Sequence, residues 1–89
     1  MRKTKLEIYV RILKIIDQNG SYETRQIADA LNISTDELKS YLAFLLKQCF
    51  VDESKVRNNK IVFLITNRGI RVLEHFKELN QELPIIRDV

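Results

Sequence analysis

The scarcity of glycine and proline limits the fold of this chain more than any other feature. Two glycines and one proline occur among its 89 residues. Both residue types interrupt regular structure, so their scarcity argues against a loop-rich or β-rich fold and leaves long stretches free to form helices. A chain of this length holds one domain, which we expect to span residues 1–84, followed by a flexible tail at 85–89.

Hydrophobic spacing predicts two helices in the first third of the chain. The first follows Thr4, a fair N-cap, and ends at the Asn-Gly pair at 19–20, which tolerates the left-handed backbone of a helix C-cap. Its apolar residues cover more than one face, which calls for a second covering helix or a second subunit. After an extended link at 21–23, we expect Thr24 to cap a brief helix that runs to Leu31.

A capping-box pattern at residues 34–37 predicts the start of a third helix, which we expect to run to about Gln48. The spacing of Leu38, Leu42 and Leu45 assigns these residues to its buried face.

The periodicity changes after the third helix. Residues 50–56 and 61–65 are rich in β-branched and aromatic side chains, which predicts two strands. Between them, Asn58 and Asn59 suit a two-residue turn with positive φ. The sequence therefore predicts a β-hairpin with a basic tip.

A fourth helix is predicted at about residues 67–82, capped by Thr66 and ending before Pro84. It carries an apolar seam with the 4, 3, 4 spacing of a short heptad pattern, which predicts a dimer interface at Val72, Phe76, Leu79 and Leu83.

The order of these elements is helix, short strand, helix, helix, hairpin and helix, a mainly α fold with a small β-hairpin. Residues 24–34 resemble a helix-turn-helix core, in which the small Ala28 lets two helices approach and Ile33 fills the turn. Residues 41–51 resemble the end of a recognition helix entering a wing, as the hairpin is called in such proteins. Residues 63–69 resemble the strand-to-helix junction of small archaeal winged helix-turn-helix regulators with a C-terminal dimerisation helix.

The resemblance implies a homodimeric transcriptional regulator that binds double-stranded DNA sequence-specifically. In such proteins the third helix enters the major groove and the wing lies on the backbone. The exposed face of the third helix then supplies the groove contacts, which we assign to Thr35, Asp36, Lys39, Ser40, Ala43 and Lys47. The wing supplies phosphate contacts, which we assign to Lys55, Arg57, Asn58, Asn59 and Lys60.

Cys49 departs from the pattern of this family, which usually has a glycine just after the recognition helix. A cysteine there requires a different cap or some strain, so we expect the helix to end later than the pattern suggests. As the one cysteine of the chain it forms no intramolecular disulfide or cysteine-based zinc site, and we expect it to be a small buried hydrophobe.

Other function classes receive less support from the sequence. The chain shows no catalytic motif, so we expect no enzyme, and we expect no cofactor and no metal. It has no apolar run of about 18 residues, which predicts a cytoplasmic protein without a membrane partner. Two alternatives to a regulator stay open: a winged helix used for protein contacts in a larger assembly, and a sequence-neutral DNA-coating protein, for which the net charge of +3 is low.

Overall fold

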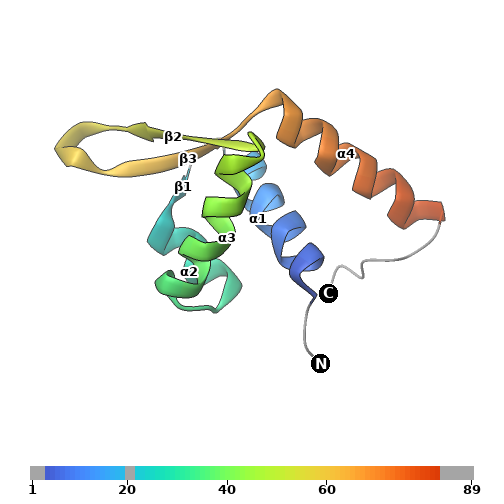
Figure 1. The fold of residues 1–89 in the computed structure, drawn as a ribbon, viewed down its shortest axis with the longest axis horizontal. Coiled ribbons are helices and arrows are strands. Elements are labelled where there is room, and N and C mark those ends of the chain that lie inside the picture. The colour runs from blue at the N-terminus through green and yellow to red at the C-terminus, as the bar shows by residue number, and fades with distance from the viewer. Residues whose placement is uncertain (1–3, 20–21, 83–89) are drawn as a thin grey trace.

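The computed structural model describes residues 4–19 and 22–82, which form four α-helices and three strands in the order expected from the sequence (Figure 1). The elements are α1 (Lys5–Asn19), β1 (Tyr22–Glu23), α2 (Thr24–Leu31), α3 (Thr35–Lys47), β2 (Val51–Lys55), β3 (Ile61–Ile65) and α4 (Asn67–Glu82). The predicted mainly α fold with a small hairpin is therefore confirmed. The expected tail at 85–89 and the seam residue Leu83 lie outside the described residues.

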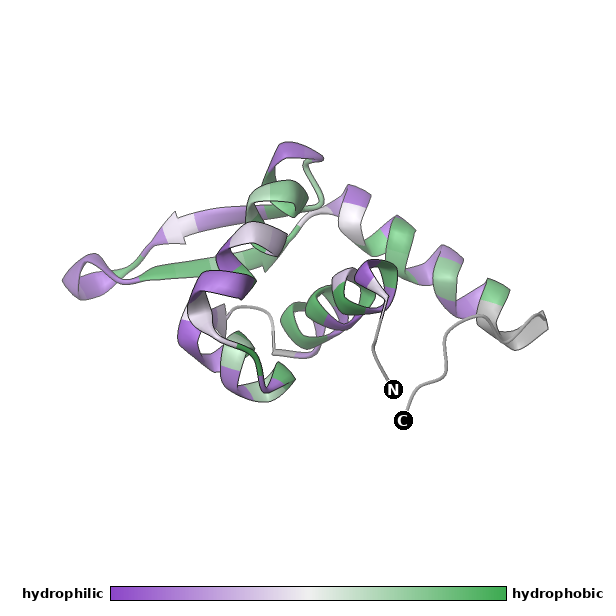
Figure 2. Ribbon diagram, turned by 60° about the horizontal axis from the view of Figure 1, so that its bottom comes forward, coloured by the Kyte–Doolittle hydropathy of each residue, from purple (hydrophilic) through white to green (hydrophobic). Residues whose placement is uncertain are grey.

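The three strands form one antiparallel sheet in the order β1-β3-β2. The hairpin of β2 and β3 is called the wing below. It extends beyond the helices on the side away from α4 (Figure 1). Its strands differ in character, because β3 is apolar along its length while β2 is mostly polar (Figure 2).

One apolar core joins the helices to the base of the sheet. The predicted buried face of α3 is confirmed, since its leucines pack there. The buried residues are Val10, Ile12, Leu13 and Ile16 of α1, Ile27 and Ala28 of α2, Leu38, Leu42 and Leu45 of α3, Val51 and Phe63 of the sheet, and Leu73 of α4. The last helix contributes least, which leaves most of its apolar residues half-exposed.

Side chains at the starts of α2 and α3 satisfy backbone groups that the helices leave unpaired. For α3 the predicted cap is confirmed, since Ser34 Oγ accepts from the Glu37 N–H at 3.1 Å. For α2 the predicted cap, Thr24, is wrong. Glu23 occupies the N-cap position, and its backbone N–H donates to Oε1 of Gln26 at 3.0 Å. The local Glu-x-x-Gln spacing supplied this alternative cap.

The end of α3 corrects two expectations about Cys49. The helix ends at Lys47 rather than later, and Cys49 adopts the left-handed backbone conformation with φ 62°. The N–H groups of Cys49 and Phe50 donate to Leu46 O and Leu45 O, each at 3.0 Å, the pattern that a terminal glycine usually makes. A non-glycine residue in this conformation costs about 1–2 kcal/mol. Cys49 is also exposed and not a buried hydrophobe, because the turn directs it away from the core.

The wing turn is one residue longer than predicted. Val56 N–H donates to Lys60 O at 2.8 Å, so the loop between these residues comprises the three residues Arg57–Asn59. The predicted positive φ values are confirmed, at 65° for Asn58 and 59° for Asn59. Asparagine tolerates this conformation better than most residues.

The start of α4 is clamped against the end of α3. The predicted Thr66 cap is confirmed, since Thr66 Oγ1 accepts from the Gly69 N–H at 3.0 Å. The same hydroxyl donates to Cys49 O at 2.6 Å, and Thr66 N–H donates to Phe50 O at 3.1 Å. A Cβ atom at Gly69 would lie 2.2 Å from Phe50 O, so this close approach requires glycine.

We therefore expect Gly69→Ala to destabilise the protein by about 1–3 kcal/mol, because the new methyl group overlaps a backbone oxygen that the clamp holds in place. Urea unfolding followed by circular dichroism measures this change. Helix propensity alone predicts the opposite sign, since alanine is favoured over glycine inside a helix by about 0.5–1 kcal/mol. Glu74→Ala, at an exposed position of α4, is the control and stays within about 0.5 kcal/mol. A Gly69→Ala variant as stable as the parent contradicts the clamp.

Candidate nucleic-acid interface

The solvent-facing side of α3 carries all six residues that the sequence assigned to groove contacts. On the opposite side, Leu38, Leu42 and Leu45 hold the helix on the core. The helical period turns the six side chains toward one sector, so they form a single polar surface. Each of them is exposed: Thr35, Asp36, Lys39, Ser40, Ala43 and Lys47.

The turn between α2 and α3 has the construction that the resemblance implied. Asn32 ends α2 in the left-handed conformation with φ 58°, and Ile33 N–H donates to Ala28 O at 3.1 Å. Ala28 is buried, which lets the helices approach, and Ile33 packs against the core from the turn. These contacts set the angle at which α3 presents its polar surface.

A groove of about 260 Å³ separates α3 from the wing. We call it the α3–wing groove. Two of the six α3 candidates, Lys39 and Ala43, line it from the helix side. The complete lining is Thr24, Lys39, Leu42, Ala43, Leu46, Glu53, Ile61 and Phe63. Glu53 is the charged lining residue that the sequence did not assign to the interface, because strand alternation shows that a residue is exposed but not that a helix lies opposite it.

The five wing candidates are exposed at the end of the hairpin, with different roles in the structure. Asn58 and Asn59 shape the loop through their positive φ values. The candidate cations Lys55, Arg57 and Lys60 surround it. The candidate set therefore combines two turn-forming residues with three cations.

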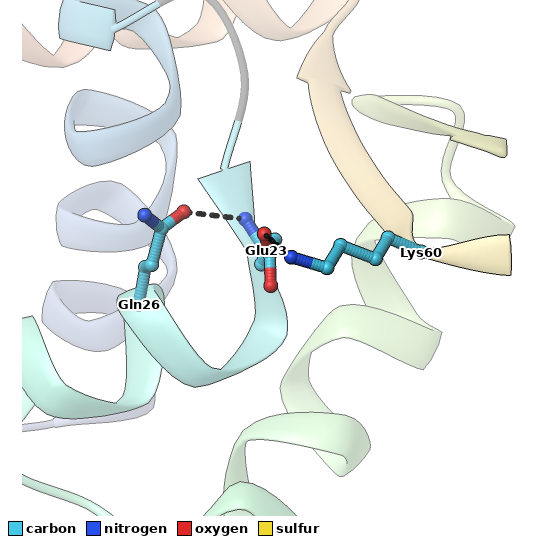
Figure 3. A network of polar contacts seen from close by, with 3 residues as sticks. All are labelled: Glu23, Gln26 and Lys60. Carbon is cyan, nitrogen blue, oxygen red and sulfur yellow. Dashed lines mark hydrogen bonds and ion pairs between the residues drawn. The ribbon is translucent and has the colours of Figure 1, made fainter. Parts of the chain in front are cut away.

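Among the described residues, Lys60 is the wing cation whose ammonium group has a carboxylate partner. Its Nζ lies 3.7 Å from Oε1 of Glu23, at the start of α2 (Figure 3). Both side chains are substantially exposed, so this ion pair contributes little stability. Since Glu23 also bonds to Gln26 through its backbone, it connects the helix-turn-helix to the wing. A phosphate that binds Lys60 must compete with this carboxylate.

Two residues of the predicted dimer seam, Val72 and Phe76, line a second, apolar groove. Val72, Phe76 and Leu79 are half-buried, and the first two pack against the protein's own core. Val72 and Phe76, together with α1 and the end of α3, enclose a groove of about 400 Å³, called the α1–α4 groove. Its lining is Leu6, Tyr9, Val10, Leu13, Phe44, Leu45, Phe50, Val72 and Phe76. Apolar stretches of α1 and α4 lie beside each other there (Figure 2).

The surplus apolar face of α1 forms one wall of this groove. Tyr9 stacks on Phe44 with ring centroids 4.6 Å apart and meets the edge of Tyr41 at 5.5 Å. Leu6 and Phe44 nevertheless stay 41% and 40% exposed, so α4 covers the α1 face only in part.

Over the described ranges 4–19 and 22–82, no group of three or more His, Cys, Asp or Glu residues is placed to hold a metal ion. Within the same ranges no helix has the length and apolarity needed to cross a membrane.

Comparison with known proteins decides the family. A family model described as winged helix-turn-helix matches residues 2–83. The chain belongs to the winged helix-turn-helix family. This membership confirms the predicted winged helix-turn-helix. A search of curated proteins gives no match.

Several solved structures share the winged-helix fold at low sequence identity. Apo MarR from E. coli aligns with a TM-score of 0.78 at 16% identity, over 82% of this chain and 55% of that one. A MarR mutant from E. coli complexed with operator DNA aligns with a TM-score of 0.76 at 16% identity, over 81% of this chain and 53% of that one. A third structure is that of MepR, a transcription regulator of the Staphylococcus aureus multidrug efflux pump MepA. It aligns with a TM-score of 0.79 at 18% identity, over 86% of this chain and 58% of that one. The chain thus spans little more than half of these neighbours.

Proposed function

We propose that this winged helix binds double-stranded DNA as a sequence-specific transcriptional regulator, with α3 in the major groove and the wing on the backbone. The observation that carries the proposal is the polar surface of α3, which is exposed along the helix while the opposite face is anchored by three buried leucines. A neighbour of the same fold is complexed with operator DNA, and another is described as a transcription regulator.

Different residues serve base and backbone contacts in this proposal. Lys39 donates to guanine O6 or N7, and the methyl group of Ala43 contacts a thymine methyl. Bases or phosphates are within reach of Thr35, Ser40 and Lys47. The carboxylate of Asp36 interacts with the positive end of the α3 dipole rather than with a base. The wing residues Lys55, Arg57, Asn58, Asn59 and Lys60 lie against the sugar–phosphate backbone and supply affinity that does not depend on sequence.

The protein acts as a homodimer in this proposal, joined through α4. Val72, Phe76 and Leu79, with Leu83 following them in the sequence, form the seam. The α1–α4 groove supports this arrangement, because its lining is apolar and its rim leaves Leu6 and Phe44 uncovered. A two-fold dimer sets the recognition helices roughly 34 Å apart, which predicts an inverted-repeat site.

Fluorescence anisotropy with mixed-sequence duplex DNA tests the DNA-binding proposal. We expect a Kd of about 1 μM or tighter at low salt, with log K falling steeply as log[salt] rises, because released counterions drive phosphate binding. Absence of binding to any duplex at low salt contradicts the proposal. It favours a winged helix used for protein contacts, for which the exposed acidic side chains of Asp36 on α3 and Glu53 on the wing are the supporting observation.

The division between base and phosphate contacts predicts different effects for two substitutions. Lys39→Ala loses about 1–3 kcal/mol of discrimination between a selected operator and mixed-sequence DNA, because a base contact disappears. Arg57→Ala weakens binding to both duplexes alike and lowers the salt slope by about one. Anisotropy titrations with both duplexes over a salt series measure both effects. An equal loss of discrimination in the two variants contradicts this assignment of roles.

For the dimer, we expect Phe76→Ala to raise the dimer Kd about tenfold or more, because the seam loses a large aromatic contact. Sedimentation equilibrium measures the change. Phe76 also packs on its own core, so Leu79→Ala provides a second seam variant, outside the groove lining, with an effect in the same direction. Glu78→Ala, exposed on the same helix, is the control and leaves the Kd within about twofold. If Phe76→Ala and Leu79→Ala both stay dimeric, α4 is not the dimer interface.

A further inference from the structure

Glu53 lies on the α3 side of the wing. In the register of the hairpin it pairs with Phe63, two residues along β2 from the pair of Val51 with Ile65. Alternate residues of a strand share a face, and Val51 and Phe63 are buried at 1% and 5% exposure. Glu53 therefore lies on the face that continues from the core toward α3, whereas the adjacent Asp52 lies on the opposite face. Both carboxylates are exposed.

The α3–wing groove combines an apolar lining with a few polar groups. Its apolar lining residues are Leu42, Ala43, Leu46, Ile61 and Phe63. Thr24 adds a hydroxyl group and Lys39 adds the one basic side chain of the lining. Glu53 is the one acidic member, so a negative charge lies inside a groove whose other polar groups suit an anion.

The geometry of duplex DNA shows what this groove faces, on the basis of the proposed function. With α3 in the major groove and the wing on the backbone beside it, one sugar–phosphate strand forms the ridge between them. The groove between α3 and the wing must then face this strand. Its apolar side chains suit the deoxyribose, and the hydroxyl group of Thr24 suits the phosphate. The carboxylate of Glu53 carries the same sign of charge as the phosphate and repels it.

We propose that Glu53 limits the affinity of the protein for the DNA backbone: its carboxylate repels the phosphates of the strand in the α3–wing groove and weakens binding to every duplex. The repulsion does not depend on base sequence, so it shortens the time spent on any site without changing the ratio between sites. Base contacts from α3 are then needed to offset it. The wing thus carries cations at its tip and an opposing charge beside α3.

The decisive experiment compares Glu53→Gln with Asp52→Asn. Each replaces one carboxylate by an amide and raises the formal net charge by one, from +3 to +4, but on opposite faces of β2. We expect Glu53→Gln to tighten binding to selected and mixed-sequence duplexes by the same factor, about three- to tenfold, and Asp52→Asn to change it by less than about twofold. The salt slope of Glu53→Gln steepens by up to about one.

Two further variants separate direct repulsion from other roles. Glu53→Asp keeps the charge and should bind like the parent protein. Glu53→Gln combined with Lys39→Ala should keep the gain, since the carboxylate acts on the phosphate. Loss of the gain in this double variant means that Glu53 acts through Lys39 and overturns the proposal. Because residues 52 and 53 are both exposed, unchanged thermal unfolding is expected and verifies folding in each variant.

The remaining outcomes distinguish this inference from the proposed function. Equal effects of Glu53→Gln and Asp52→Asn overturn the inference and leave the DNA-binding proposal intact. Weaker binding of Glu53→Gln to the selected duplex alone also overturns it, because this result identifies Glu53 as a base contact, such as an acceptor for a cytosine amino group. If the parent protein binds no duplex, the proposed function and the inference both fail.

Discussion

The clamp between the end of α3 and the start of α4 is the contact on which the rest of this structure depends. The hydroxyl group of Thr66 bonds to the Cys49 carbonyl and caps α4, while the Phe50 carbonyl accepts from Thr66 N–H directly beside Gly69. Arg68 lies over the Phe50 ring, 5.5 Å from its centroid. Two segments about 17 residues apart in the chain thereby meet at one point, and the wing is the hairpin that connects them.

The clamp sets the directions in which the surrounding elements leave the core. From the clamp, α3 runs back toward α2, the wing extends to one side of the molecule, and α4 extends to the other (Figure 1). The polar surface of α3 and the cationic wing therefore belong to one region of the molecule. The apolar α1–α4 groove forms a separate one. The described part of the chain thus carries two surfaces of opposite character, one polar with cations and one apolar.

Cys49 shows how tightly the backbone is constrained at this point. Its positive φ is a conformation that glycine adopts without strain, yet the chain holds a cysteine there. The hydrogen bonds of Cys49 and Phe50 to α3, together with the bond from Thr66, fix the backbone despite this cost. Local residue preference alone predicts a longer helix. The bonds within the helix end and the tertiary bond from Thr66 outweigh that preference and end α3 at Lys47.

The sequence by itself determined the elements and their faces, because these depend on local spacing and capping. The buried leucines of α3, the Thr66 cap and the positive φ values at Asn58 and Asn59 all follow from neighbours a few residues away. Contacts between distant segments were decided by the tertiary structure alone. The pairing of Lys60 with Glu23, the position of Glu53 opposite α3 and the partial covering of α1 by α4 depend on how the elements pack. Periodicity shows which side of an element is buried, but it does not show which partner lies against that side.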